Sequence, residues 1–148
     1  MIGSLRGTVL ERIAPSVLLV EVAGVGYICS VTSGTFAELE PTVEVFLHVH
    51  HHIREDDQTL FGFVSRMERD TFEVLIATHG VGPALAMNIL SVFAPQALAT
   101  VVASGDTAAL TSVPGVGKKT AERLMVELKS RLVGDAVSGN HGSGIQST

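Results

Sequence analysis

The chain contains a single cysteine, Cys29, and no tryptophan in its 148 residues. One cysteine excludes an intramolecular disulfide framework of the kind that stabilises small secreted domains. Long apolar runs are also missing, since none approaches the roughly 20 residues that cross a bilayer as a helix. The N-terminal sequence MIGSLRGTVLERI lacks the apolar stretch and the cleavage site of a signal peptide. These absences predict a soluble, cytoplasmic protein with no membrane partner.

Positive charge is scarce overall but concentrated locally. Ten Lys and Arg residues stand against fifteen Asp and Glu, for a net charge of −5, whereas nucleic-acid-binding proteins are typically basic. Half of the basic residues nevertheless fall within one short segment: Lys118, Lys119, Arg123, Lys129 and Arg131. Acidic residues gather between Glu38 and Asp57, where Arg54 is the only basic residue. One region of the molecule is therefore expected to attract phosphate and another to repel it.

The first 64 residues predict a β domain. Five runs rich in β-branched and aromatic residues are separated by turn residues. The runs are 4–13, 16–22, 26–31, 43–51 and 58–64. Apolar residues alternate along the fourth run, so that one face of this strand is expected to be buried. Five short strands favour an OB-type barrel.

From residue 65 the apolar pattern changes to helical spacing. Ser65 and Glu68 match a capping box, Gly80 is expected to stop the first helix, and Asp106 is expected to cap a later one. About five short helices are predicted, the last over 118–132. The fold class is therefore α+β, with a barrel over 1–64 and an all-α domain over 65–133. The Gly/Ser-rich end, 134–148, predicts a flexible linker.

A short sequence is duplicated in the helical part. HGVGPALAMNIL (79–90) and PGVGKKTAERLM (114–125) both contain Gly-Val-Gly, 35 residues apart. Each copy also has an alanine four positions after its second glycine, and a predicted helix lies on either side of it. The chain therefore carries a repeated helix–turn–helix unit.

A glycine-rich turn that opens a helix is a candidate phosphate site. The Walker type is excluded, because Ser112 replaces its first glycine, Lys119 replaces its final hydroxyl residue, and a short helix precedes the turn. The alternative is a helix N-terminus whose free N–H groups and dipole bind an anion. Such a site reads no bases, and its affinity falls with salt. The alternative interpretation is an ordinary glycine cap in a helical hairpin, with no phosphate site. This alternative is stronger for the first copy than for the second.

These turns resemble the helix-hairpin-helix motif of DNA-binding proteins, here in tandem. The whole chain resembles the bacterial RuvA family. The matching segments are MIGSLRG at the start, AGVGY at 23–27, IREDDQTLFGF at 53–63, GVGP at 80–83 and VPGVGKKTAERLMVELKSRL at 113–132. No single segment is decisive, and their order and spacing together carry the resemblance.

The resemblance implies a non-catalytic scaffold that binds four-way (Holliday) junctions and holds them open for branch migration in recombination and repair. It implies a homotetramer, with an octamer of two tetramers left open. The implied partners are junction DNA, the ATPase RuvB and, as a further candidate, the resolvase RuvC. Family members continue past the linker into a small domain that contacts RuvB, so we expect this chain to represent part of a longer protein.

The resemblance also assigns site residues. Phosphate contacts are expected from the backbone around Val81, Gly82, Val116 and Gly117 and from the side chains of Lys118, Lys119 and Arg123. Glu55 and Asp56 match an acidic pin at the junction crossover, where their charge would repel duplex phosphates and disfavour uninterrupted duplex. Arg54 either contacts a crossover phosphate or pairs with a neighbouring carboxylate. Ala84 departs from the family, which usually has lysine there.

Other chemistries were weighed against this one. HVHHH places His48, His50 and His52 on one strand face, which can suit zinc, but metal sites usually draw their ligands from several elements. Polar strand residues beside the pin are the favoured interpretation. The consecutive acids at 55–57 lack the scattered geometry of a two-metal nuclease, and Cys29 is expected to be a buried, inert thiol. We expect no metal, no cofactor and no catalytic residue. A junction-cleaving nuclease and a plain duplex-binding module remain the alternative functions.

Overall fold

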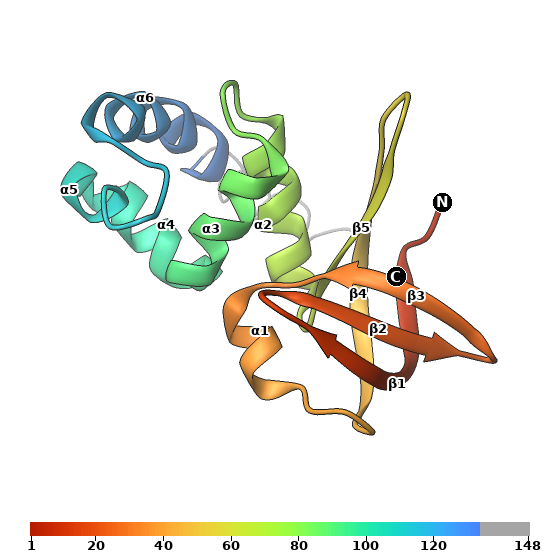
Figure 1. Ribbon diagram of the computed structural model, residues 1–148. Helices are drawn as coiled ribbons and strands as arrows, with labels where there is room; N and C mark the ends of the chain where they lie inside the picture. The colour runs from red at the N-terminus through yellow and green to blue at the C-terminus, as the bar shows by residue number, and fades with distance from the viewer. Residues whose placement is uncertain (134–148) are drawn as a thin grey trace, which may run out of the picture. The chain divides into compact units, whose positions relative to one another are not determined.

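A computed structural model describes residues 1–133, and the predicted linker at 134–148 lies outside the described residues. The elements run along the chain as β1 (Ser4–Ile13), β2 (Val17–Val22), β3 (Val25–Ser30), α1 (Ser33–Glu38), β4 (Glu44–Ile53), β5 (Gln58–Phe63), α2 (Arg66–Ala77), α3 (Pro83–Val92), α4 (Pro95–Ser104), α5 (Thr107–Leu110) and α6 (Lys118–Leu128). Figure 1 shows the five strands, with the short α1 among them, in the first part of the chain and helices α2 to α6 in the second. The predicted α+β class is confirmed.

The five strands close into one barrel in the order β1-β2-β3-β5-β4. Neighbouring strands are antiparallel except for β3 and β5, which run parallel at Cys29↔Leu60 and Ser30↔Phe61. The alternation along β4 is as expected, because Val45, Leu47 and Val49 are buried inside the barrel. The five-stranded barrel predicted from the sequence is confirmed.

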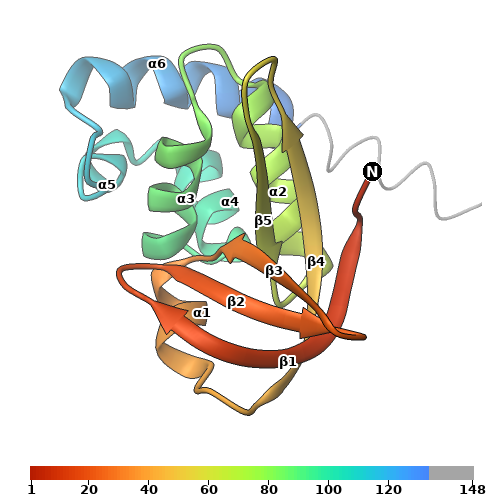
Figure 2. The same cartoon turned by 45° about the vertical axis from the view of Figure 1, so that its right-hand side comes forward.

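The hairpin of β4 and β5 continues beyond the barrel. β1 pairs with β4 only as far as Ser4↔His48, whereas β4 and β5 stay paired to Ile53↔Gln58. The backbone N–H of Arg54 donates to the carbonyl oxygen of Asp57 at 2.8 Å and closes the turn. Figure 2 shows this turn at the end of a long two-stranded projection. The acidic loop therefore stands at a hairpin tip, beyond the part of β4 that pairs with β1.

One helix in the barrel segment is absent from the sequence-based prediction. α1 begins after Thr32, whose hydroxyl oxygen accepts from the Thr35 N–H at 3.3 Å as an N-cap. Thr35 is buried, and the Leu39 N–H bonds back to its carbonyl at 3.2 Å. A six-residue helix that includes Gly34 has no apolar period to detect, so its caps and burial decide the conformation.

The helical part follows the predicted caps. Ser65 Oγ accepts from the Glu68 N–H at 3.1 Å, and Asp106 Oδ1 accepts from the Ala109 N–H at 3.2 Å. The last helix differs from the expectation: α6 is α-helical only to Leu128 and continues as a π-helical segment, Lys129–Val133. A five-residue segment is too short for its apolar pattern to distinguish a period of 3.6 from a wider turn.

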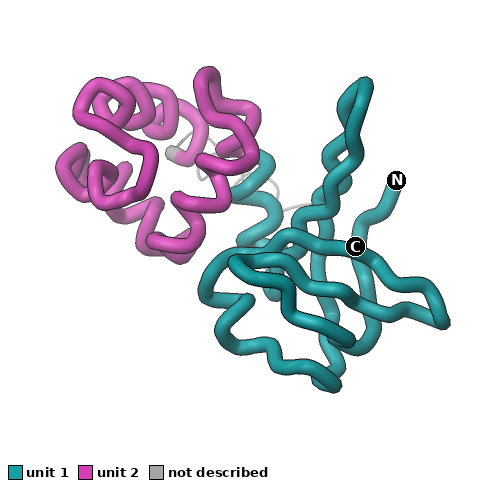
Figure 3. The backbone as a smooth tube through the Cα atoms, viewed as in Figure 1, with its two compact units in different colours: residues 1–73 teal, residues 74–148 magenta. Residues whose placement is uncertain are grey.

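The chain divides into two compact units, residues 1–73 and 74–148, with the division inside α2 (Figure 3). The first turns of α2 belong to the barrel unit, because the fully buried Phe72 packs against Phe61 and Phe63 at ring-centroid distances of 5.0 and 5.1 Å. The boundary after residue 64 remains a proposal. No single described helix is long and apolar enough to span a membrane; α3 and α4 pass that test only as a pair bent by 92°.

Candidate nucleic-acid interface

The two Gly-Val-Gly turns have the same backbone conformation. Gly80 and Gly115 adopt φ of +85° and +91°, in the left-handed region that side chains rarely enter. Gly82 and Gly117 are extended, with φ of −85° and −87°, and are the N-caps of α3 and α6. The first glycine of each copy is thus required by the turn, and the second opens a helix.

The residues around the glycines repeat the same contacts 35 positions apart. Val81 and Val116 are each 6% exposed, and their N–H groups donate to the carbonyls of Thr78 and Val113 at 3.1 and 3.0 Å. Each valine therefore anchors its turn in the core. The duplicated alanines, Ala86 and Ala121, are fully buried.

The start of α6 offers free backbone donors. The structure records no side-chain cap on Gly117, and the first helical N–H with a recorded backbone acceptor is that of Ala121, bonded to Gly117 at 2.8 Å. A Cβ added at Gly117 would meet nothing within 4 Å, and the same holds for Gly82. An anion can therefore approach the first amides of α6 without steric hindrance.

The first copy offers fewer groups that could bind an anion than the second copy does, for two reasons. Pro83 is the first residue of α3 and has no N–H, whereas Lys118, its counterpart in α6, contributes one. Ala84 is exposed and uncharged where the second copy has the exposed Lys119. The missing lysine was expected from the sequence, whereas the missing donor at Pro83 was not, although a proline at the first helical position is its signal.

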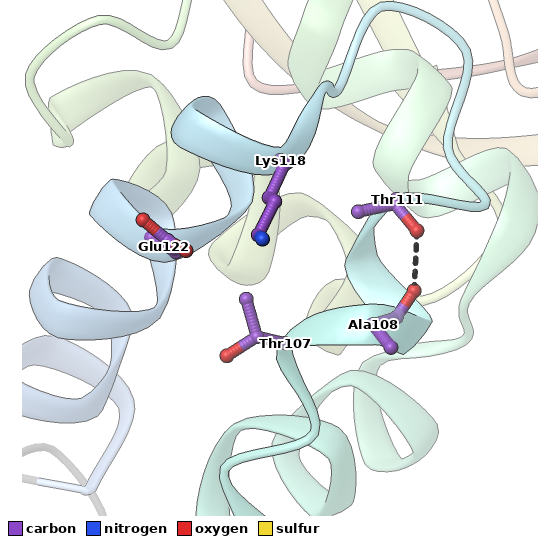
Figure 4. Close-up of a pocket in the computed structure, with 5 residues that line it drawn as sticks. All are labelled: Thr107, Ala108, Thr111, Lys118 and Glu122. Carbon is purple, nitrogen blue, oxygen red and sulfur yellow. Dashed lines mark hydrogen bonds between the residues drawn. The ribbon is translucent and has the colours of Figure 1, made fainter.

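Lys118 lines a pocket of about 360 Å³ between α5 and α6, together with Thr107, Ala108, Thr111 and Glu122. Its side chain points toward Thr107 (Figure 4). The Thr111 hydroxyl is occupied, since it donates to the Ala108 carbonyl at 2.6 Å.

The two copies contact each other reciprocally. Asn88 in α3 donates through Nδ2 to the carbonyl oxygen of Pro114, in the second turn, at 3.1 Å. Arg123 in α6 lies 35 residues after Asn88, and its guanidinium lies against the first turn. A Cβ built on Gly80 would be 3.3 Å from Arg123 Cζ. The structure thus places Arg123, a predicted phosphate ligand, where it also joins the two turns.

The predicted pin residues lie together at the hairpin tip. Arg54, Glu55, Asp56 and Asp57 are all exposed. Among the described residues, no ion pair joins Arg54 to any of the three acids. Its Nε instead donates to Nε2 of His52 at 3.2 Å. The expectation that Arg54 could pair with a neighbouring carboxylate is therefore not what the structure records.

The histidines of β4 have defined partners that the sequence pattern did not reveal. His50 Nδ1 lies 2.8 Å from Glu73 Oε2, and His50 Nε2 lies 3.4 Å from His52 Nδ1. On the other strand face, His51 accepts from the Ile2 N–H at 3.1 Å and bonds Gln58 through Nε2 at 2.9 Å. Within residues 1–133, no group of three or more His, Cys, Asp or Glu is arranged to hold a metal ion.

Cys29 lies inside the barrel, with no exposed surface. Burial raises the pKa of its thiol from 9.0 to about 12. The expectation of a buried cysteine is confirmed, and the protonated thiol is a poor nucleophile.

Comparisons with known proteins agree with both parts of the chain. Residues 1–62 match the family profile of the RuvA N terminal domain, and residues 72–130 match that of a SAM-like helix-hairpin-helix tandem. Three relatives, each called Holliday junction branch migration complex subunit RuvA, come from Pseudomonas fluorescens SBW25, Halorhodospira halophila and Shewanella loihica. Their identities are 48% over 132 residues, 50% over 140 and 44% over 144.

These alignments cover 88%, 94% and 97% of this chain, and 64%, 67% and 69% of the relatives. The chain therefore spans about two thirds of the length of the curated relatives that it matches, and slightly less for the first of them.

Proposed function

The chain belongs to the RuvA family, and from this premise we propose that it binds four-way DNA junctions, holds them open and brings the RuvB motor to them. The observation that carries the proposal is the duplicated turn. Gly82 and Gly117 are the N-caps of α3 and α6, no side chain caps either helix, and an added Cβ at either glycine would meet nothing within 4 Å. These turns recognise phosphate and no base, as a protein that acts on any sequence requires.

Phosphate contacts come from two kinds of group. The backbone around Val81, Gly82, Val116 and Gly117 presents N–H groups at helix starts, where the dipole adds attraction for an anion. Lys118 and Lys119 add positive charge at the second turn, whereas the Arg123 guanidinium, which α6 supplies, lies against the first turn. We therefore assign most of the affinity to the second turn and expect it to fall steeply with salt.

The acidic loop distinguishes four-way junctions from uninterrupted duplex DNA. Glu55 and Asp56 are exposed at the end of the β4–β5 hairpin, away from the barrel core. In a homotetramer, each subunit would bring two carboxylates to the crossover. Their charge opposes the phosphates of an uninterrupted duplex but is tolerated where four arms diverge. An acidic protein can bind DNA in this way, because its two charge types act on different parts of the substrate.

The assembly and partners follow from the same family membership. We propose a homotetramer that acts in the cytoplasm without catalysis of its own. RuvB supplies ATP hydrolysis, and RuvC is a further candidate partner on the same junction. Exposed apolar side chains in each unit, such as Ile28 at 64% and Val126 at 72%, provide surface for self-association. The molar mass measured by light scattering, as the protein elutes from a size-exclusion column, tests the tetramer directly.

The deciding experiment is a gel-shift titration of a four-way junction and a linear duplex of equal length, at two salt concentrations without metal. The wild type is expected to prefer the junction, and Glu55→Gln/Asp56→Asn is expected to gain duplex binding. Equal affinity for both DNAs, unchanged in the variant, would show a plain duplex-binding module. Cleavage of the junction on addition of Mg²⁺ would instead support a nuclease.

A further inference from the structure

A continuous series of hydrogen-bonded side chains connects α2 to the base of the acidic loop. Glu73 Oε2 lies 2.8 Å from His50 Nδ1, and His50 Nε2 lies 3.4 Å from His52 Nδ1. Arg54 Nε then donates to His52 Nε2 at 3.2 Å. The imidazole rings of His50 and His52 are 5.6 Å apart, and His50 also packs on Phe72 at 5.4 Å. Both ends of the series, Arg54 and Glu73, are exposed, whereas His50 and His52 between them are partly buried.

The chemistry of the donors fixes the direction of the series. Arg54 Nε–H can only donate, so His52 Nε2 must accept, and His52 must be neutral with its proton on Nδ1. That proton is donated to His50 Nε2, which leaves the proton of His50 on Nδ1, facing the Glu73 carboxylate. Each histidine thus donates one hydrogen bond and accepts one, between the donor Arg54 and the acceptor Glu73, and one pattern of tautomers satisfies all three bonds.

We propose that neutral His52, oriented by His50 and Glu73, is a positioning residue that holds the Arg54 guanidinium away from the pin carboxylates, so that their charge stays uncompensated. This inference rests on the proposed function of the acidic loop. An exposed arginine next to Glu55 and Asp56 would otherwise pair with them intermittently. Such pairing would cancel part of the repulsion that rejects duplex DNA.

The groups that face His52 decide when the series holds. Arg54 and Asp57 face it from the loop, His50 from its own strand, and the Phe61 ring from β5 at 6.1 Å. From α2, Glu73 acts through His50 and is itself 3.8 Å from Arg69 Nε.

Burial, followed by the charges of Arg54 and His50, lowers the pKa of His52 below 6.5, and Asp57 partly opposes this shift. His52 is therefore neutral at pH 7.5. As the pH falls through this lowered pKa, protonation turns Nε2 into a donor that faces a donor, and Arg54 is released.

Two substitutions of His52 test whether its hydrogen bonds position Arg54 or whether any side chain at this place is enough. In His52→Gln, the side-chain amide can still accept from Arg54 and donate to His50, but it cannot titrate. In His52→Val, the strand-forming side chain can do neither. His48→Gln, in the same strand but outside the series, is the matched control. His48 has an edge-to-face contact with Phe46 at 5.0 Å.

The first readout is ¹⁵N NMR of the full chain without DNA, which reports the His52 tautomer and the Arg54 Nε–H signal. The second is the junction-over-duplex affinity ratio at pH 7.5 and at a pH below the His52 pKa that the NMR titration gives. We expect the ratio of the wild type to be about fivefold higher at pH 7.5 than in His52→Val, the size of one ordinary net hydrogen bond. The ratio should fall at the lower pH in the wild type and in His48→Gln, but not in His52→Gln.

The outcomes distinguish this proposal from the proposed function. If the wild type shows no junction preference at either pH, the function fails, and the NMR signals still decide whether the series exists. The positioning role is overturned if His52 carries its proton on Nε2 at pH 7.5. It is also overturned if His52→Val keeps the wild-type ratio, or if His52→Gln loses it to the same extent as His52→Val.

Discussion

The side-chain amide of Asn88, in α3, donates a hydrogen bond of 3.1 Å to the carbonyl oxygen of Pro114, at the start of the second Gly-Val-Gly turn. The equivalent residue of the second copy, Arg123, lies over Gly80 of the first turn. Each hairpin thus braces the turn of the other. Since both turns would hold phosphates, their mutual position fixes the spacing of the two contacts on one DNA arm.

Loss of this brace is testable with Asn88→Ser, which keeps a similar helix propensity but shortens the side chain. We expect the free energy of unfolding to fall by about 1 kcal/mol, the net value of one hydrogen bond. Amide exchange in the 115–117 turn should become faster. Thr100→Ser is the control, because the Thr100 hydroxyl bonds only to the Gln96 carbonyl of its own helix. Equal exchange rates in the two variants would contradict the brace.

Because no side chain caps α6 at Gly117, adding one should raise the stability of the protein and lower its affinity for DNA. In Gly117→Ser, the new hydroxyl can accept from the amides of Lys119 or Thr120 and raise stability by roughly 0.3 kcal/mol. The same hydroxyl uses up the donors that would bind phosphate, so DNA affinity should fall about tenfold. Chemical denaturation and gel-shift titration measure the two effects.

The control for this substitution is Gly3→Ser, at another glycine whose added Cβ would meet nothing within 4 Å. It should change neither stability nor affinity. If Gly117→Ser binds DNA as the wild type does, the amides at the start of α6 do not contact phosphate.

The turns and the strand order along the chain were predictable because their signals are local. The left-handed φ of the first residue in each turn requires a glycine, which is visible in the sequence as Gly80 and Gly115. The alternate burial along β4 requires apolar residues at every second position, which is also visible. The parallel closure of the barrel between β3 and β5 has no local signal, since it depends on how distant strands meet. The packing of Phe72 on Phe61 and Phe63 could not be predicted from the sequence for the same reason.

The candidate site divides in the same way. The positions of Lys118, Lys119 and the glycines at a turn and a helix start could be predicted from spacing, because these signals are local. The bond from Arg54 to His52 and the contact of Arg123 with Gly80 could not, because both depend on which rotamer a long side chain adopts. Sequence therefore predicts which groups a site contains better than it predicts which of them are already engaged.

The buried thiol gives a prediction about pH. With its pKa raised to about 12, Cys29 stays protonated at pH 8.5, and the barrel also excludes reagents. We expect no reaction with a thiol-specific disulfide reagent in the folded chain and one equivalent after denaturation. In Gly62→Ala, the added Cβ would lie 2.6 Å from Cys29 Sγ, so the barrel must shift and labelling should accelerate. Labelling of the native wild type as fast as the denatured chain would contradict the burial.

The unequal charge of the two hairpins leads to the last prediction. Ala84 is exposed at the position in α3 that Lys119 has in α6. Ala84→Lys would therefore place an ammonium group beside the first turn and neutralise one further phosphate. Each neutralised phosphate steepens the dependence of log affinity on log salt by about 0.9. We expect that increase in slope, with tighter binding at low salt, in gel-shift titrations over several salt concentrations. Ala99→Lys, on the exposed surface of α4, adds the same charge away from both turns. A slope raised equally by both lysines would indicate general attraction, whereas an effect confined to Ala84→Lys would locate a phosphate at the first turn.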